Sequence, residues 1–236
     1  MAETVAGRLG EQLARLEAAL RASGRAPTEA RLLAVSKLQS ARAVEEAYAA
    51  GQRDFGENYV QELVRKAAEL AHLTDLRWHL IGHLQSNKAK AVCEVASSVQ
   101  TVDSLRLAHE LGKRRQAVRG SEPLDVLVEV NVAGEASKSG CTPAELGEVL
   151  AAVDVEPALR LRGLLTVPPA TDDPALAQPH FEALTRLRRE HGGAARLPEL
   201  SMGMSADLEV AVACGSTWVR VGTAIFGQRA EGEAPR

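Results

Sequence analysis

The chain has 236 residues, with 28 lysines and arginines against 31 aspartates and glutamates and a formal net charge of −3. Its basic residues are scattered among acidic ones, which excludes the concentrated basic surface typical of nucleic-acid-binding proteins. This length is close to the roughly 250 residues of a single α/β barrel, and it is enough to bury a large core without disulfides or metals.

The N-terminal segment predicts an amphipathic helix ahead of the first strand. Its leucines recur at helical spacing, at Leu9, Leu13, Leu16 and Leu20. The segment lacks the uninterrupted apolar stretch of a signal peptide or a membrane span. The chain also has three cysteines without C-x-x-C spacing, Cys93, Cys141 and Cys214, which is typical of a reducing compartment. We therefore expect a cytoplasmic protein that binds neither nucleic acid nor membrane.

Beyond this helix, short apolar runs alternate with longer helical patterns. We expect strands over residues 32–36, 54–56, 77–81, 99–102, 124–130, 161–167, 199–203 and 218–222. Helices are expected over residues 41–50, 58–71, 87–96, 104–117, 143–153, 174–191 and 206–214. Such strict alternation indicates a parallel sheet, because each parallel connection needs a crossover. Eight strands predict an α/β fold: a single (β/α)8 TIM-type barrel domain over residues 1–236, with an extra N-terminal helix and a core over about residues 30–228.

The C-terminal ends of barrel strands carry the chemistry of this fold, so polar residues and glycines at these ends are the candidates for a site. They are Lys37, Asn58, Gln85, Asp103, Asn131, Thr166, Ser205, Gly222 and Thr223. Residues two apart on a strand share a face. We therefore expect Lys37 to point the same way as Val35, and Gly222 the same way as Arg220.

Lys37 ends the apolar run that begins at Leu32, and it has two interpretations. In the first, its aliphatic stem packs on the strand end while its ammonium group reaches solvent. In the second, it is a desolvated amine that condenses with an aldehyde.

Two glycine-containing turns follow the last two strands. Gly203-Met-Ser205 precedes the helix expected from Ala206, and Gly222-Thr223 begins a turn that ends at Gly227. Barrels bind phosphate at this place because backbone N–H groups at helix N-termini favour an anion. Two ordinary structural turns are the alternative.

Arg220 lies inside the last apolar strand, where a charge is costly to bury without a partner. An ion pair with Asp207 or Glu209 is one interpretation. Donation of a hydrogen bond to the ring nitrogen of an aromatic ligand is the other.

Two further features of the sequence are a pair of histidines and a loop lysine. His79 and His83 are four residues apart with no third ligand nearby in the sequence, so we expect no metal site. Lys138 lies in the loop after the fifth strand, near the expected barrel mouth, or is simply a solvated lysine.

Five ordered motifs resemble those of the pyridoxal phosphate homeostasis protein family. They are Val35-Ser-Lys37, Phe55-Gly-Glu-Asn58, Trp78-His-Leu-Ile-Gly-His-Leu-Gln-Ser-Asn-Lys88, Leu200-Ser-Met-Gly-Met-Ser205 and Val219-Arg-Val-Gly-Thr-Ala-Ile-Phe-Gly227. That family is similar in fold to the N-terminal barrel of bacterial alanine racemase, in the fold-type III group of pyridoxal-phosphate proteins. One departure is Leu164 after Gly163, where many relatives have a methionine.

The resemblance implies a role for each candidate residue. Lys37 forms the internal aldimine with the aldehyde of pyridoxal 5'-phosphate (PLP), and Arg220 contacts the pyridine nitrogen. Asn58 lies beside the ring. The phosphate is held by Ser205, Gly222 and Thr223.

The resemblance also implies a protein that carries or buffers PLP, maintains vitamin B6 and amino-acid homeostasis, and turns over no substrate. An arginine at the ring nitrogen disfavours the protonated pyridinium that makes PLP a strong electron sink. Racemisation needs a second base, which racemases take from a separate β domain, whereas this chain ends about ten residues after its last motif. We therefore expect a non-enzymatic monomer that contacts PLP-dependent apoenzymes transiently.

Two other functions remain open from the sequence. One is a PLP-dependent amino-acid racemase of fold type III that uses Lys37 and an unidentified second base. The other is a cofactor-free Schiff-base lyase acting on a sugar phosphate.

Overall fold

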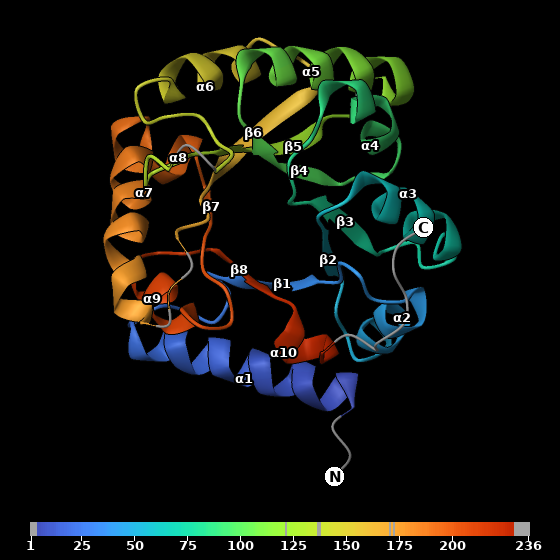
Figure 1. The fold of residues 1–236 in the computed structure, drawn as a ribbon, viewed down its shortest axis with the longest axis vertical. Coiled ribbons are helices and arrows are strands. Elements are labelled where there is room, and N and C mark those ends of the chain that lie inside the picture. Colours follow the sequence, from blue (N-terminus) through green and yellow to red (C-terminus); the bar gives the residue numbers. More distant parts are fainter. Residues whose placement is uncertain (1–3, 121, 136–137, 170, 172, 229–236) are drawn as a thin grey trace.

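The computed structural model describes residues 4–120, 122–135, 138–169, 171 and 173–228. Eight parallel strands close a barrel in chain order, with β8 pairing back to β1 (Figure 1). They are β1 (Arg31–Val35), β2 (Asp54–Glu57), β3 (Arg77–Leu80), β4 (Ser98–Val102), β5 (Leu124–Glu129), β6 (Leu159–Leu165), β7 (Glu199–Ser201) and β8 (Trp218–Val221). Every expected strand is present, which confirms the (β/α)8 barrel.

Helices surround the barrel on all sides in Figure 1. They are α1 (Val5–Ala22), α2 (Ala41–Ala49), α3 (Val60–Glu69), α4 (Ala89–Val95), α5 (Leu105–Arg119), α6 (Leu146–Asp154), α7 (Gln178–Glu190), α8 (Gly193–Arg196), α9 (Leu208–Ala213) and α10 (Thr223–Phe226). Two 3₁₀ turns, η1 (Ser86–Lys88) and η2 (Pro174–Ala177), precede α4 and α7. The sequence did not predict α8 and α10, because four residues are too few to show helical periodicity.

The expected N-terminal helix is α1, and it lies along the outside of the barrel beside α9 and α10 (Figure 1). The hydroxyl of Thr4 caps it by accepting a hydrogen bond from the Gly7 amide at 3.1 Å. Leu9, Leu16 and Leu20 are buried against the barrel layer, whereas Leu13 of the same pattern is exposed. Among the described residues, no helix has both the length and the hydropathy needed to cross a bilayer.

The core has two layers that differ in polarity. Residues between the sheet and the helices form one apolar cluster, to which β8 contributes Val219 and Val221. Alternate residues of the same strand, Trp218 and Arg220, are buried outside that cluster, and the Trp218 ring lies tilted to that of His79 with centroids 5.2 Å apart. The barrel interior therefore contains polar groups, and these must find partners there.

Ion pairs occupy the N-terminal ends of the strands. Arg77 pairs with Asp54 at 2.6 Å, and Arg31 pairs with Glu199 at 2.9 Å while its guanidinium lies 4.0 Å above the Trp218 ring. Burial alone raises the pKa of Asp54, but hydrogen bonds from Arg77 and His79 bring it well below its usual range. These pairs stabilise the end of the barrel where the strands begin. The opposite end, where the strands terminate, is the end expected to carry a site.

Candidate functional site

Closure of the barrel brings Lys37 next to the turn after β8. Strands β1 and β8 are paired with Leu33 opposite Arg220 and Ala34 opposite Val221. A cavity of about 430 Å³ opens where both strands end, lined by Val35, Lys37, Gln39, Gly222, Thr223, Gly227 and Gln228. Val35 and Lys37 thus face the same cavity, as strand alternation predicts. The two ends of the chain form one site.

Lys37 is exposed at this cavity. Lys37 therefore lacks the desolvation that the second interpretation expected, and it reaches solvent as the first did; its condensation with an aldehyde stays a prediction. An exposed amine beside a cavity is accessible to a ligand that enters from solvent.

The turn after β8 is the start of α10. The carbonyl of Gly222 accepts hydrogen bonds from the amides of Ile225 and Phe226 at 2.8 and 3.0 Å. The first amides of a helix have no carbonyl to bond within that helix, so those of Thr223 and Ala224 are available as donors. A Cβ atom at Gly222 would lie 3.2 Å from the Val35 carbonyl oxygen, so this position is crowded for any larger residue.

Ser205 lies in the loop between β7 and α9 and is half-buried. The loop turns at Gly203, whose φ of 91° lies in the left-handed region and whose Cβ would lie 2.3 Å from the Ala211 side chain. Asp207 accepts a hydrogen bond from the Met204 amide at 2.5 Å and fixes the turn. Ser205 and the half-buried Asn58 are both outside the lining of the 430 Å³ cavity.

Arg220 is buried and bonded to backbone rather than to a carboxylate. Its Nη1 donates to the Ser201 carbonyl at 2.7 Å and to the Ser201 hydroxyl at 2.9 Å, and its Nη2 donates to the Thr166 carbonyl at 2.9 Å. Of the two acidic partners that the sequence suggested, Glu209 pairs with Arg15 at 2.5 Å instead, and Asp207 acts on Arg220 only by electrostatic attraction while it accepts from the Met204 amide. Burial lowers the pKa of Arg220 to about 10, against the attraction of Glu129 and Asp207. The guanidinium therefore stays charged at neutral pH.

A chain of hydrogen bonds runs through the barrel interior from Arg220. The Ser201 hydroxyl donates to Gln100 at 2.7 Å, and the Gln100 amide lies 3.4 Å from Nδ1 of His79. Nε2 of His79 lies 2.9 Å from Asp54 at the opposite end of the barrel. A tautomer with the His79 proton on Nε2 satisfies both contacts, since Nδ1 then accepts and Nε2 donates.

Glu129 at the end of β5 is a buried carboxylate near Arg220 that the sequence analysis missed. It is only 8% exposed, and one carboxylate oxygen, Oε2, has no hydrogen-bond partner. Burial and the nearby Asp103 raise the pKa of Glu129 to about 7, while Arg220 opposes the shift. The sequence did contain a signal for Glu129, because a charged residue stands within the apolar run over residues 124–130. The same signal identified Arg220 in the last strand.

The remaining candidates have local partners. The Thr166 hydroxyl donates to the Val130 carbonyl at 2.8 Å, and Asn131 donates to the Glu135 carbonyl at 2.8 Å. His83 lies 3.4 Å from Asp103, whereas His79 is buried inside the barrel, so the two histidines do not converge. Among the described residues no group of three or more metal-ligating side chains occurs. Gln85 and Lys138 are exposed.

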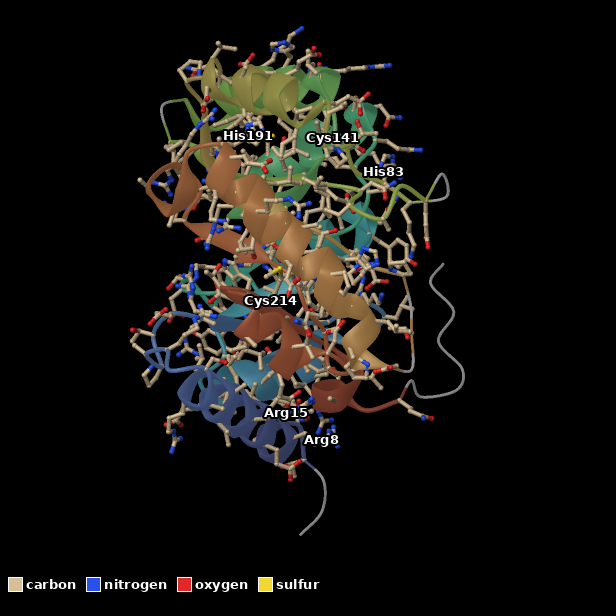
Figure 2. The ribbon with its side chains drawn as sticks, turned by 90° about the vertical axis from the view of Figure 1, so that its left-hand side faces the viewer. Arg8, Arg15, His83, Cys141, His191 and Cys214 are labelled. Atoms are coloured by element: carbon tan, nitrogen blue, oxygen red, sulfur yellow. The ribbon has the colours of Figure 1, made fainter. Side chains whose placement is uncertain are left out.

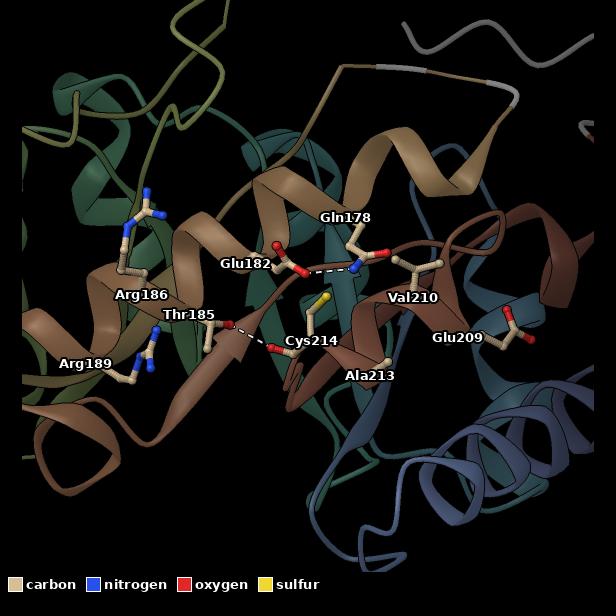
Figure 3. Close-up of a pocket in the computed structure, with 9 residues that line it drawn as sticks. All are labelled: Gln178, Glu182, Thr185, Arg186, Arg189, Glu209, Val210, Ala213 and Cys214. Atoms are coloured by element: carbon tan, nitrogen blue, oxygen red, sulfur yellow. Dashed lines mark hydrogen bonds between the residues drawn. The ribbon is translucent and has the colours of Figure 1, made fainter.

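A larger cavity, of about 690 Å³, lies away from the strand ends, between α7 and α9 (Figure 3). Its polar groups bond locally: Gln178 donates to Glu182 at 2.7 Å, and the Thr185 hydroxyl donates to the Cys214 carbonyl at 2.7 Å. Burial raises the pKa of the Cys214 thiol, which disfavours the reactive thiolate. We assign no function to this groove.

Known proteins resemble this chain over most of its length. A family model described as the alanine racemase N-terminal domain matches residues 12–230. The pyridoxal phosphate homeostasis protein of Pseudomonas aeruginosa is 49% identical over 226 residues, which are 96% of each chain. The protein of the same name from Escherichia coli is 46% identical over 231 residues, covering 95% of this chain and 97% of that one. The structure of PipY from Synechococcus elongatus with PLP bound matches with a TM-score of 0.77 and 40% identity, covering 91% of this chain and 100% of that one.

Proposed function

The chain belongs to the pyridoxal phosphate homeostasis protein family, and on that basis we propose that it binds PLP through Lys37 and carries it without turning over a substrate. The observation that supports this most is the shared cavity of Lys37 and the Gly222-Thr223 turn. A ligand that carries both an aldehyde and a phosphate requires an amine and an anion-binding turn on the same cavity.

The residues present fit this cofactor. The cavity volume of about 430 Å³ is within the range of about 300–1,000 Å³ for small-molecule sites. The amides of Thr223 and Ala224 and the hydroxyl of Thr223 are donors for the phosphate, and Ser205 supports them from the neighbouring loop. Asn58 follows β2 at the same end of the barrel, and the resemblance implies a place for it beside the ring.

Lys37 provides the covalent attachment. Its amine is the group on this cavity that would hold the cofactor by condensing with its aldehyde, with loss of one water molecule. The exposed position of Lys37 would admit the aldehyde from solvent and would let solvent water hydrolyse the link for release. A carrier needs this reversibility.

Arg220 favours carriage over catalysis. When bound, PLP supplies an electron sink whose strength depends on protonation of its ring nitrogen. Arg220 is charged, has only donor hydrogens, and is fixed by Ser201 and Thr166. A donor of this kind facing the ring nitrogen would keep that nitrogen unprotonated. The cofactor would then be a weak electron sink. We extend the proposal to a cytoplasmic monomer that delivers PLP to apoenzymes by transient contact.

Absorbance spectroscopy and peptide mapping test the attachment. Protein incubated with PLP is expected to turn yellow, and borohydride reduction is expected to leave the label on Lys37. Lys37→Ala abolishes both, whereas Lys90→Ala, at an exposed lysine on α4 paired with Glu94, leaves both unchanged. A Lys37→Ala variant that binds PLP as the wild type does would overturn the proposal.

A separate assay addresses catalysis, with an amino-acid racemase as the alternative. L-alanine or L-serine is added to the loaded protein and optical activity is followed. We expect no loss beyond that caused by the same concentration of free PLP. Faster loss that depends on Lys37 would establish a racemase and reject the carrier.

A further inference from the structure

A fully buried lysine lies directly behind the proposed attachment site. The side chain of Lys66, on α3, is 0% exposed. Its Nζ donates to the Ser36 carbonyl at 2.6 Å, to Glu57 Oε1 at 2.7 Å and to Glu62 Oε2 at 3.1 Å. An ammonium group has three hydrogens, so these three acceptors use all of them. Burying such a charge is costly, and it persists only where its partners are arranged around it.

The same cluster fixes the backbone on both sides of Lys37. On the N-terminal side, Lys66 bonds the Ser36 carbonyl, and the Ser36 hydroxyl donates to Glu57 at 2.7 Å. On the C-terminal side, the Leu38 amide donates to Glu62 Oε2 at 2.7 Å. The peptide groups that flank Lys37 are therefore both bonded to one buried charge cluster.

Leu38, which follows Lys37, has an unfavourable backbone conformation that needs such fixation. Leu38 has a φ of 60°, and it is the single non-glycine residue with positive φ in the part of the chain that the structure describes. A left-handed leucine costs on the order of 1 kcal/mol and persists only when its surroundings determine it. The bond from the Leu38 amide to Glu62 is such a determinant.

We propose that Lys66, Glu57 and Glu62 are positioning residues that orient the Lys37 amine toward the turn after β8. This inference rests on the proposed function, since it assigns the cluster to the PLP-binding lysine. Burial raises the pKa of the Glu57 carboxyl, and attraction to the Lys66 ammonium opposes that shift. Loss of Lys66 thus removes both the anchor of Ser36 and the attraction that opposes the rise in the pKa of Glu57. Lys66 itself does not compete for PLP, because all its hydrogens are engaged.

The first test compares two neighbouring positions on α3. Lys66→Met keeps the aliphatic stem and removes the ammonium, and Arg65→Met removes an exposed pair with Glu69 as the matched control. Hydrogen exchange of the Leu38 amide in the PLP-free protein reports the positioning directly. We expect at least tenfold faster exchange and at least tenfold weaker PLP binding in Lys66→Met, which is about 1.4 kcal/mol. Arg65→Met is expected within twofold of the wild type in both measurements.

A merely structural ion pair predicts a different result. Folded Lys66→Met would then melt at a lower temperature but bind PLP with the wild-type dissociation constant and protect Leu38 as before. That result would overturn the inference. If the wild type itself fails to form a PLP link on Lys37, the proposed function fails instead, so the two failures are distinguishable.

A second pair of variants decides the matter should Lys66→Met not fold. Glu62→Gln keeps an oxygen that accepts from the Leu38 amide, whereas Glu62→Leu has none. We expect Glu62→Leu to weaken PLP binding at least tenfold and to expose the Leu38 amide to exchange, with Glu62→Gln within threefold of the wild type. Equal binding by Glu62→Leu and wild type contradicts the positioning role.

Discussion

Arg15 of α1 donates a hydrogen bond from Nη1 to the carbonyl oxygen of Ser205 at 2.7 Å. Its other nitrogens bond Glu209 at 2.5 and 2.6 Å, which fixes the guanidinium in place. Arg8 of the same helix donates to the Ile225 carbonyl at 2.6 Å, and both arginines are labelled on α1 in Figure 2. The helix outside the barrel is thus bonded to both turns that we assign to the phosphate.

Arg15→Met should therefore weaken binding of the phosphate more than binding of the ring. The variant frees the Ser205 loop, so we expect three- to tenfold weaker binding of PLP and little change for pyridoxal, which has no phosphate. Arg21→Met, which breaks an exposed pair with Glu17 on the same helix, is the control. Dissociation constants from absorbance titrations give the comparison. An equal loss for PLP and pyridoxal would show that Arg15 does not act through the phosphate turns.

Gly82 should not tolerate a side chain. A Cβ atom there would lie 2.1 Å from the Asn58 carbonyl oxygen, so Gly82→Ala must displace the backbone of Asn58. We expect a loss of about 1–3 kcal/mol in the free energy of unfolding together with weaker PLP binding. Gly10→Ala is the matched control, because nothing lies within 4 Å of its Cβ and alanine favours the helix by about 0.8–1 kcal/mol. Urea unfolding measures the stability of both variants. A destabilised Gly10→Ala, or a Gly82→Ala as stable as the wild type, would contradict the close contact at Gly82.

The sequence predicted the parts of the fold that repeat. Short runs of three to seven residues separated by helical patterns identified all eight strands. Because strand order in a closed barrel follows chain order, the meeting of Lys37 with the Gly222-Thr223 turn could also be predicted. Contacts of this kind depend on topology and need no knowledge of individual side-chain partners.

Partners of buried charges could not be predicted in the same way. Arg220 bonds two backbone carbonyls, and a carbonyl has no sequence signature, so the sequence indicated only the nearby acidic residues Asp207 and Glu209 as partners. Lys66 lies three residues after Leu63 and four before Leu70, on the buried face of α3. Nothing in the sequence indicated its partners Ser36, Glu57 and Glu62. Such clusters depend on how α3 packs against the ends of β1 and β2.

Ser201→Ala should uncouple Arg220 from the interior of the barrel. The Ser201 hydroxyl accepts from Arg220 and donates to Gln100, and its removal leaves the Gln100 carbonyl oxygen buried without that donor. We expect a loss of about 1–3 kcal/mol in the free energy of unfolding. Ser97→Ala, at an exposed serine before β4, should change stability by less than about 0.5 kcal/mol. A Ser201→Ala variant as stable as Ser97→Ala would mean that water replaces the lost hydroxyl.

Glu129 should make the stability of the protein depend on pH between about 4.5 and 7. Its pKa is raised from 4.5 to about 7, chiefly by burial and further by Asp103, while Arg220 lowers it. The folded state therefore binds the Glu129 proton more tightly than the unfolded state does. Its contribution to stability is fully present below about pH 4.5 and is lost as pH rises through 7.

Glu129→Gln removes this titration while keeping the size of the side chain. A shift of this size corresponds to about 3 kcal/mol, so the variant should gain stability relative to the wild type as pH rises from 5 to 8. Glu148→Gln, at an exposed glutamate of α6, is the control and should follow the wild-type curve. Urea unfolding at several pH values measures the difference. Parallel curves for Glu129→Gln and wild type would mean that Glu129 is ionised in the folded protein at pH 5, with Arg220 outweighing the effect of burial.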